Sequence, residues 1–129
     1  MAECTSANLP TILLVEDDPD TRRYMVSWLE AEGYRVRAAS NGREALDVLL
    51  DEVPCVMVVD LMMPVMDGAE FRRRQQQMPG VSSVPFIMVS GTHDAARIAR
   101  DLGIEDVVAK PFDADHLLDI VASHCHHRP

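Results

Sequence analysis

Five short apolar runs alternate with segments of helical periodicity, and this alternation constrains the fold of the chain more than any other feature. The runs predict β-strands at residues 11–15, 34–38, 55–59, 86–89 and 107–109. The first, third and fourth runs are apolar on both faces, which is typical of central parallel strands covered by helices. The run at 34–38 alternates between apolar and polar residues, so we expect it at an edge of the sheet.

Five helices are predicted between and after the strands, most of them with a recognisable first residue. The expected N-terminal caps are Asp18 (followed by Pro19), Asn41, Asp67 and, near the last helix, Asp113. Glu44 and Glu70 stand three residues after the second and third caps and complete two capping boxes. The fourth helix is expected to end at Gly103, and the polar run at 72–77 predicts a solvated helix face. The whole pattern predicts an α/β fold of the (βα)5 type, with a parallel sheet and helices on both faces.

The charge balance and the hydropathy exclude some partners. With 12 basic and 21 acidic residues the formal net charge is −9, whereas nucleic acids and anionic membrane surfaces attract clustered Lys and Arg. We therefore expect no direct nucleic-acid binding. No apolar run approaches the roughly 20 residues that span a bilayer, so we also expect no membrane insertion.

The cysteines and the chain ends bear on location and on domain limits. Three widely spaced cysteines are present: Cys4, Cys55 and Cys125. They form no CxxC pair and predict no disulfide framework, which is typical of the reducing cytoplasm. The first residues lack the apolar core of a signal peptide. The length fits one domain, which we place at 10–123, between a disordered N-terminal extension at 1–9 and a frayed C-terminal tail at 124–129.

Reactive side chains follow four of the predicted strands. They are Glu16 and Asp17 after the first strand, Asp60 after the third, Ser90 after the fourth and Lys110 after the last. Because ligands bind beyond the carboxyl ends of parallel strands, we expect these side chains to converge. Carboxylates held close together repel one another unless a hard cation neutralises them, and such oxygen ligands favour Mg²⁺. Asp18 is either a helix cap or an outer acid of the metal site. Lys110 is the only lysine beside eleven arginines, which suggests that a compact ammonium group is needed there.

A metal ion, an ammonium group and a hydroxyl around one carboxylate are what phosphoryl transfer to an aspartate requires. Four motifs at these positions carry a family resemblance: ILLVEDDP at 12–19, VVDLMMPVMDG at 58–68, MVSGT at 88–92 and AKPF at 109–112. In their order and spacing they resemble the receiver domain of two-component response regulators, over about residues 10–122. The resemblance implies a flavodoxin-like, doubly wound sheet of five parallel strands in the order 2-1-3-4-5.

The resemblance also implies a role for each of these residues. Asp60 is the expected phosphoacceptor. Asp17, Asp60 and the backbone carbonyl of Met62 are expected to bind Mg²⁺ directly, and Glu16 to act through a metal-bound water. Ser90 is expected to hydrogen-bond the phosphoryl group after transfer, and Lys110 to pair with it. The bond between Lys110 and Pro111 is expected to be cis.

The implied function is signalling by phosphorylation rather than catalysis on a separate substrate. A sensor histidine kinase or a phosphotransfer protein would supply the phosphoryl group. Phosphorylation would switch protein–protein contacts through the fourth helix, the last strand and the last helix. The only reactions expected of the chain itself are self-phosphorylation from small donors and self-dephosphorylation. Both a stand-alone regulator and the receiver of a longer protein fit the sequence.

Three departures and two alternatives accompany the resemblance. Glu16 stands where the family often has Asp, a change that a role through water should tolerate, and Val107 stands where many receivers have Tyr or Phe. The segment 113–123 contains no Lys or Arg, which argues against the dimer face of transcription-factor receivers and favours a monomer or a weak dimer. One alternative is an Mg²⁺-dependent phosphohydrolase, but such an enzyme usually needs a general acid where this chain has Met62. The other is a non-phosphorylated interaction module of the same fold, against which the intact set of reactive residues argues.

Overall fold

The computed structural model describes residues 10–63 and 65–125. Its strands are β1 (Thr11–Val15), β2 (Arg35–Ala39), β3 (Val56–Asp60), β4 (Phe86–Ser90) and β5 (Asp106–Ala109). Its helices are α1 (Pro19–Ala31), α2 (Gly42–Asp51), α3 (Gly68–Gln76), α4 (Ala95–Asp101) and α5 (Ala114–His124). Strands and helices alternate along the chain, as the sequence predicts.

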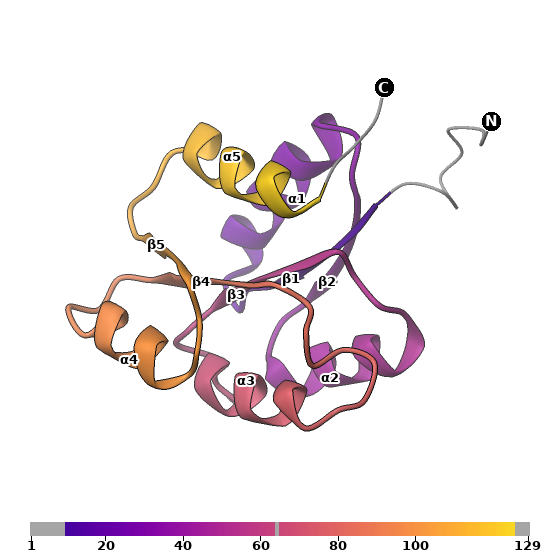
Figure 1. Ribbon diagram of the computed structural model, residues 1–129. Helices are drawn as coiled ribbons and strands as arrows, with labels where there is room; N and C mark the ends of the chain where they lie inside the picture. Colours follow the sequence, from indigo (N-terminus) through magenta and orange to yellow (C-terminus); the bar gives the residue numbers. More distant parts are fainter. Residues whose placement is uncertain (1–9, 64, 126–129) are drawn as a thin grey trace.

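The strands form one parallel sheet in the order β2-β1-β3-β4-β5. The predicted strand order is therefore confirmed, and β2 lies at an edge as expected. Helices α1 and α5 cover one face of the sheet, and α2, α3 and α4 cover the other (Figure 1). Because the strands are parallel, their carboxyl ends lie at one edge of the sheet, where the groups that follow them can meet.

Two hydrophobic cores lie on the two faces of the sheet because side chains alternate along each strand. Leu13 and Val15 of β1 face the core under α2, α3 and α4, and Ile12 and Leu14 face the core under α1 and α5. Every residue of β1, β3 and β4 is buried, which explains why these runs are apolar on both faces.

The local predictions hold to within one residue. The strand at 11–15 is confirmed as expected, and the other observed strands differ from the expected ranges by one residue at one or both ends. All four predicted caps accept a hydrogen bond from a backbone N–H in the first turn of their helix. Gly103 follows α4 with φ 69°, a left-handed conformation that glycine adopts without strain.

The prediction of a solvated face at 72–77 is wrong for two of its residues. Arg72 is 9% exposed and Gln75 is fully buried. Arg72 donates to the carbonyls of Leu102 (3.0 Å) and Gly103 (2.9 Å), and Gln75 donates to the carbonyl of Val81 (2.7 Å). Buried polar groups are retained where they are hydrogen-bonded, so these two residues tie α3 to neighbouring segments. Arg74 of the same helix pairs with an exposed glutamate and fits the prediction.

Two expectations about the end of the chain also need correction. His124 is the last residue of α5 and Cys125 is buried, so the expected frayed tail does not include them. The remaining positions of the expected tail and of the N-terminal extension, 126–129 and 1–9, lie outside the described residues. Cys125 also forms a disulfide with Cys55, their Cα atoms 5.6 Å apart, so the expectation of no disulfide is wrong. Among the described residues, no helix is both long and apolar enough to cross a membrane.

Candidate functional site

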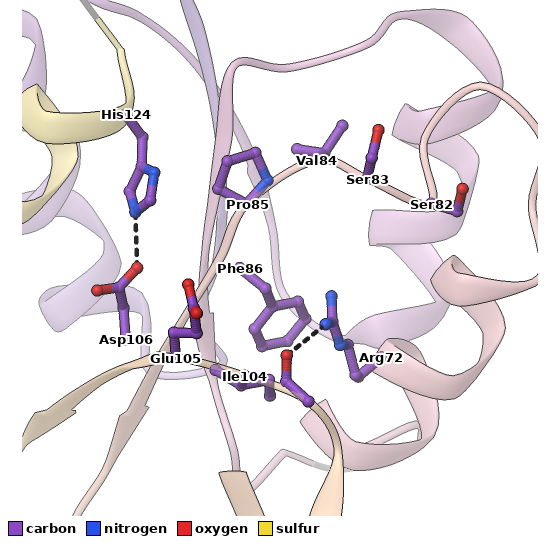
Figure 2. Close-up of a pocket in the computed structure, with 11 residues that line it drawn as sticks. Arg72, Ser82, Ser83, Val84, Pro85, Phe86, Ile104, Glu105, Asp106 and His124 are labelled. Atoms are coloured by element: carbon purple, nitrogen blue, oxygen red, sulfur yellow. Dashed lines mark hydrogen bonds and ion pairs between the residues drawn. The ribbon is translucent and has the colours of Figure 1, made fainter. Parts of the chain in front are cut away.

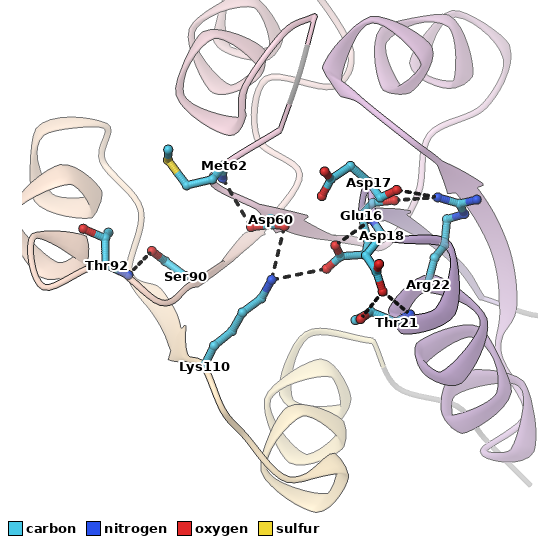
Figure 3. Close-up of polar contacts among 10 residues, drawn as sticks. All are labelled: Glu16, Asp17, Asp18, Thr21, Arg22, Asp60, Met62, Ser90, Thr92 and Lys110. Carbon is cyan, nitrogen blue, oxygen red and sulfur yellow. Dashed lines mark hydrogen bonds and ion pairs between the residues drawn. The ribbon is translucent and has the colours of Figure 1, made fainter.

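The predicted site residues lie together at the carboxyl edge of the sheet (Figure 3). Asp60 is the last residue of β3 and Ser90 is the last residue of β4, so both are held by the parallel ladder. Glu16 directly follows β1 and Lys110 directly follows β5. The Lys110–Pro111 bond is cis, as the resemblance implies. Residues up to 94 positions apart in the sequence are thereby brought to one place.

Lys110 bridges two buried carboxylates from different strands. Its Nζ lies 3.2 Å from Oδ2 of Asp60 and 3.5 Å from Oε1 of Glu16. Asp60 is 6% exposed and Glu16 is 2% exposed, whereas the side chain of Lys110 is 33% exposed. A single ammonium group thus faces two carboxylates that are largely removed from water, which leaves the site with an excess of negative charge.

Burial is the main influence on the pKa of Glu16. Burial, reinforced by the charge of Asp60, raises the pKa of Glu16 from 4.5 to about 7, although the backbone N–H of Asp18 donates to it and acts in the opposite sense. Burial alone would lower the pKa of Lys110, but the charges of Asp60 and Glu16 outweigh burial and raise it. The raised pKa keeps Lys110 protonated, and the raised pKa of Glu16 means that this carboxyl group takes a proton more readily than an ordinary glutamate.

The carboxylates of Glu16, Asp17 and Asp60 can hold a metal ion. Each offers one oxygen atom, and the three atoms lie within 4.8 Å of one another. Asp17 is exposed and forms the solvent side of the cluster, whereas Glu16 and Asp60 are buried and form its inner side. Because the donors are all oxygens and one side is open, the set fits a hard divalent cation that keeps some of its waters.

Backbone and hydroxyl groups complete the surroundings of Asp60. The N–H of Met62 donates to Oδ1 of Asp60 at 3.2 Å; the metal-ligand role expected for the Met62 carbonyl stays a prediction. Ser90 is 1% exposed, and its Oγ accepts from the N–H of Thr92 at 3.1 Å. As an acceptor there, the hydroxyl keeps its own hydrogen to donate toward the site.

Two neighbours of the acidic loop have roles that the sequence left open or did not reveal. Asp18 accepts from the N–H and the hydroxyl of Thr21, at 2.8 and 2.7 Å, and these hydrogen bonds lower its pKa. It is therefore the cap of α1. Arg22 donates to the backbone carbonyls of Glu16 (2.9 Å) and Asp17 (3.3 Å). The sequence did not predict this role for Arg22. Its hydrogen bonds go to backbone carbonyls, which every residue has, so no side-chain pattern marks the contact.

A pocket of about 310 Å³ lies at the opposite end of the sheet (Figure 2). It is lined by Arg72, the segment 82–86, the segment 103–106 and His124. The two segments lie at or before the amino ends of β4 and β5, while Arg72 comes from α3 and His124 ends α5, so the pocket shares no residue with the site at the carboxyl edge.

The comparisons with known proteins agree with one another. The family model described as "Response regulator receiver domain" matches residues 12–122. The response regulator receiver protein CpdR of Brucella abortus (strain 2308) is 37% identical over 116 residues, which cover 85% of this chain and 89% of that protein. The transcriptional regulatory protein GltR of Pseudomonas aeruginosa is 33% identical over 115 residues. The match covers 88% of this chain but only 48% of GltR, so the chain spans about half the length of that regulator.

A solved structure of similar shape is also known. It is the receiver domain of the sensor histidine kinase PA1611 from Pseudomonas aeruginosa PAO1, with a magnesium ion coordinated in its active-site cleft. The TM-score is 0.83 at 26% sequence identity, and the match covers 89% of this chain and 96% of that one. The same fold thus occurs both in receivers named as separate regulators and in receivers named as part of a kinase.

Proposed function

Because the chain belongs to the response regulator receiver domain family, we propose that Asp60 accepts a phosphoryl group from a sensor histidine kinase or a phosphotransfer protein. The observation that carries the proposal is the position of Lys110, whose ammonium group lies 3.2 Å from Asp60 and 3.5 Å from Glu16. A lysine that bridges two buried carboxylates beside a cluster of metal-binding oxygens fits the stabilisation of an incoming phosphoryl group.

We propose Mg²⁺ as the cofactor, held by Asp17, Asp60 and the backbone carbonyl of Met62, with Glu16 acting through a water. The three acidic side chains carry more negative charge than Lys110 balances, which supports a cationic ligand. When bound, the ion neutralises the carboxylates and the phosphoryl oxygens, so that an anionic nucleophile can approach an anionic donor. The receiver of PA1611 contains magnesium in its active-site cleft, which favours the same ion here.

Each residue around Asp60 has a separate role in the proposed transfer of the phosphoryl group. An oxygen of Asp60 forms a bond to phosphorus as the bond between phosphorus and the donor's histidine nitrogen breaks, and that nitrogen keeps the electron pair. The N–H of Met62 orients Asp60 by donating to its Oδ1. After transfer, Lys110 pairs with a phosphoryl oxygen, and Ser90 donates its hydroxyl hydrogen to another.

The output we propose is a change in protein–protein contacts through the surface formed by α4, β5 and α5. Ser90 ends β4 and Lys110 follows β5, so a phosphoryl group that draws on both acts on the segments that lead into this surface. The downstream target is a protein. We propose that the chain acts as a monomer or weak dimer in the cytoplasm, where kinases of this class take their phosphoryl group from ATP.

The chain itself is proposed to catalyse only self-phosphorylation from small donors and self-dephosphorylation. Met62 supports this reading, because its thioether cannot serve as the general acid that a phosphohydrolase uses at such a position. Sustained release of phosphate from an ester, with many turnovers for each protein molecule, would favour the hydrolase instead.

The test is Mg²⁺-dependent labelling by radioactive acetyl phosphate. Asp60→Asn should remove the label, because an amide is neither a nucleophile nor a hard metal ligand of comparable charge. Asp67→Asn is a matched control that makes the same chemical change at the exposed cap of α3, where asparagine also caps well, and it should label like the unaltered chain. Equal labelling of the Asp60 variant would refute the assignment.

A further inference from the structure

The last turn of α5 is attached to three other segments of the chain. Cys125, directly after α5, is bonded to Cys55, directly before β3. The hydroxyl of Tyr34 donates to the carbonyl of Cys125 at 3.3 Å. Nε2 of His124 lies 2.6 Å from Oδ2 of Asp106, the first residue of β5 (Figure 2). The end of α5 is thus fixed over the amino edge of the sheet, far from the acidic cluster.

The two cysteine residues differ in their exposure to solvent. Cys125 is 2% exposed, whereas Cys55 is only partly buried. Cys55 is therefore the residue of the pair that we expect a small thiol or disulfide to reach, while Cys125 belongs to the buried core under α1 and α5. This asymmetry is what an exchange reaction needs, because one sulfur is attacked and the other waits as the resolving thiol.

We propose that Cys55 and Cys125 form a redox modification site, which a small disulfide such as oxidised glutathione converts from a dithiol to the intramolecular disulfide. The Cys55 thiolate attacks one glutathione sulfur, forming a mixed disulfide and releasing one reduced glutathione. The Cys125 thiolate then attacks the Cys55 sulfur and releases the second. Two protein thiols are oxidised, one glutathione disulfide is reduced to two thiols, and the reverse sequence restores the dithiol.

We expect the disulfide between Cys55 and Cys125 to be reversible because the cytoplasm is reducing. In a reducing cytoplasm a disulfide is usually transient or redox-sensing rather than a permanent staple. This step rests on the cytoplasmic location given in the proposed function. Because the Cα atoms are 5.6 Å apart, within the normal range for disulfides, the bond needs no large movement of the backbone in either direction.

The consequence of oxidation is mechanical. In the dithiol state the end of α5 keeps its contacts with Tyr34 and Asp106 but loses its covalent attachment to β3. Local opening of this turn then becomes easier, because the bond no longer limits how far the helix end can move. The redox state of the two cysteines thus controls how easily the last turn of α5 opens, and α5 is part of the surface formed by α4, β5 and α5.

The test begins with the full chain, reduced completely and then equilibrated in glutathione buffers from fully reduced to fully oxidised. Free thiols are alkylated, and intact mass and non-reduced peptides are measured. We expect a form two hydrogens lighter, with Cys55 and Cys125 in one linked peptide, that increases and disappears reversibly with the buffer. A disulfide that survives excess reduced glutathione, thiols that survive excess oxidised glutathione, or a stable glutathione adduct at Cys55 would each overturn the proposal.

Single serine variants provide the controls. Cys55→Ser and Cys125→Ser should each abolish the linked form, whereas Cys4→Ser should leave it intact. A linked form that persists in either of the first two variants, or that vanishes in the third, would assign the reaction to another pair and overturn the proposal.

Amide hydrogen exchange tests the mechanical consequence without any substitution. We expect the amides of the last turn of α5 to exchange at least about tenfold more slowly in the oxidised form, with the amides of α3 as an internal reference. Equal exchange in the two forms would refute the anchoring role.

Labelling by acetyl phosphate separates this proposal from the proposed function. Asp60 lies at the far end of β3 from Cys55, roughly 16 Å along the strand, so both redox forms should label alike. No labelling in either form would count against the phosphoacceptor role alone, since the glutathione titration does not depend on it.

Discussion

The buried carboxyl group of Glu16 makes a contribution to the stability of the metal-free protein that falls as pH rises. Below its ordinary pKa of 4.5 the group is protonated in both the folded and the unfolded chain. Between 4.5 and about 7 the unfolded chain has released the proton while the folded chain still holds it, so raising the pH favours unfolding. Above about 7 the folded state carries the full cost of the buried charge.

The size of this effect follows from the pKa. A rise from 4.5 to about 7 corresponds to about 3 kcal/mol of unfolding free energy, at 1.36 kcal/mol for each pKa unit. Most of it, about 2 to 3 kcal/mol, is lost between about pH 5 and pH 8. The acids with lowered pKa values, such as Glu44 and Glu52, act with the opposite sign and at lower pH.

The variant Glu16→Gln isolates this contribution. Glutamine has the same shape, can accept from the N–H of Asp18, and does not titrate. Urea unfolding in the presence of a chelator should show the variant gaining about 2 to 3 kcal/mol over the unaltered chain as the pH rises from about 5 to about 8. With typical urea dependences for a small domain, the two midpoints should separate by about 1 to 3 M. Both proteins must be compared with the disulfide intact.

Two outcomes would show that the reasoning is wrong. A stability difference that stays constant across this pH range would mean that Glu16 keeps its ordinary pKa in the folded chain. A difference that is just as large in saturating Mg²⁺ would mean that the ion does not neutralise this carboxylate, because a bound cation should stabilise the charged form and reduce the pH dependence.

Three further variants test the surroundings of the site. Lys110→Arg keeps the charge but has a wider, planar head. We expect both the unaltered chain and this variant to label with acetyl phosphate. We expect labelling to change the fluorescence of Trp28, which packs edge-on against Phe112, in the unaltered chain alone, and an equal change in the variant would contradict this. The double variant Met62→Asn and Thr92→Glu should hydrolyse its aspartyl phosphate about tenfold faster than the unaltered chain, because the new side chains can orient the attacking water. This corresponds to a barrier lower by ~1.4 kcal/mol, and equal or slower release of phosphate from labelled protein would contradict the prediction. Gly68→Ala should lower the urea-unfolding free energy by about 1 to 3 kcal/mol, because a Cβ there would lie 2.8 Å from a backbone carbonyl at the end of β3, and unchanged stability would refute the clash.

The sequence by itself determined the fold class and the place of the site, because both depend on local patterns. Alternation of apolar runs with helical periodicity indicates strands and helices from neighbouring residues alone. A cap such as Asp67 acts within its own first helical turn. Since ligands gather at the carboxyl ends of parallel strands, finding where β3 and β5 end was enough to bring Asp60 and Lys110 together.

The tertiary structure decided the features that depend on partners distant in sequence. Arg72 is buried because carbonyls 30 and 31 residues away accept its hydrogen bonds. Cys55 and Cys125 pair across 70 residues, although neither has a local signal for it. The raised pKa of Glu16 likewise arises from burial and from the charge of Asp60 on another strand. A sequence pattern reports what a residue does to its neighbours along the chain, whereas burial, pairing and charge depend on neighbours that only folding supplies.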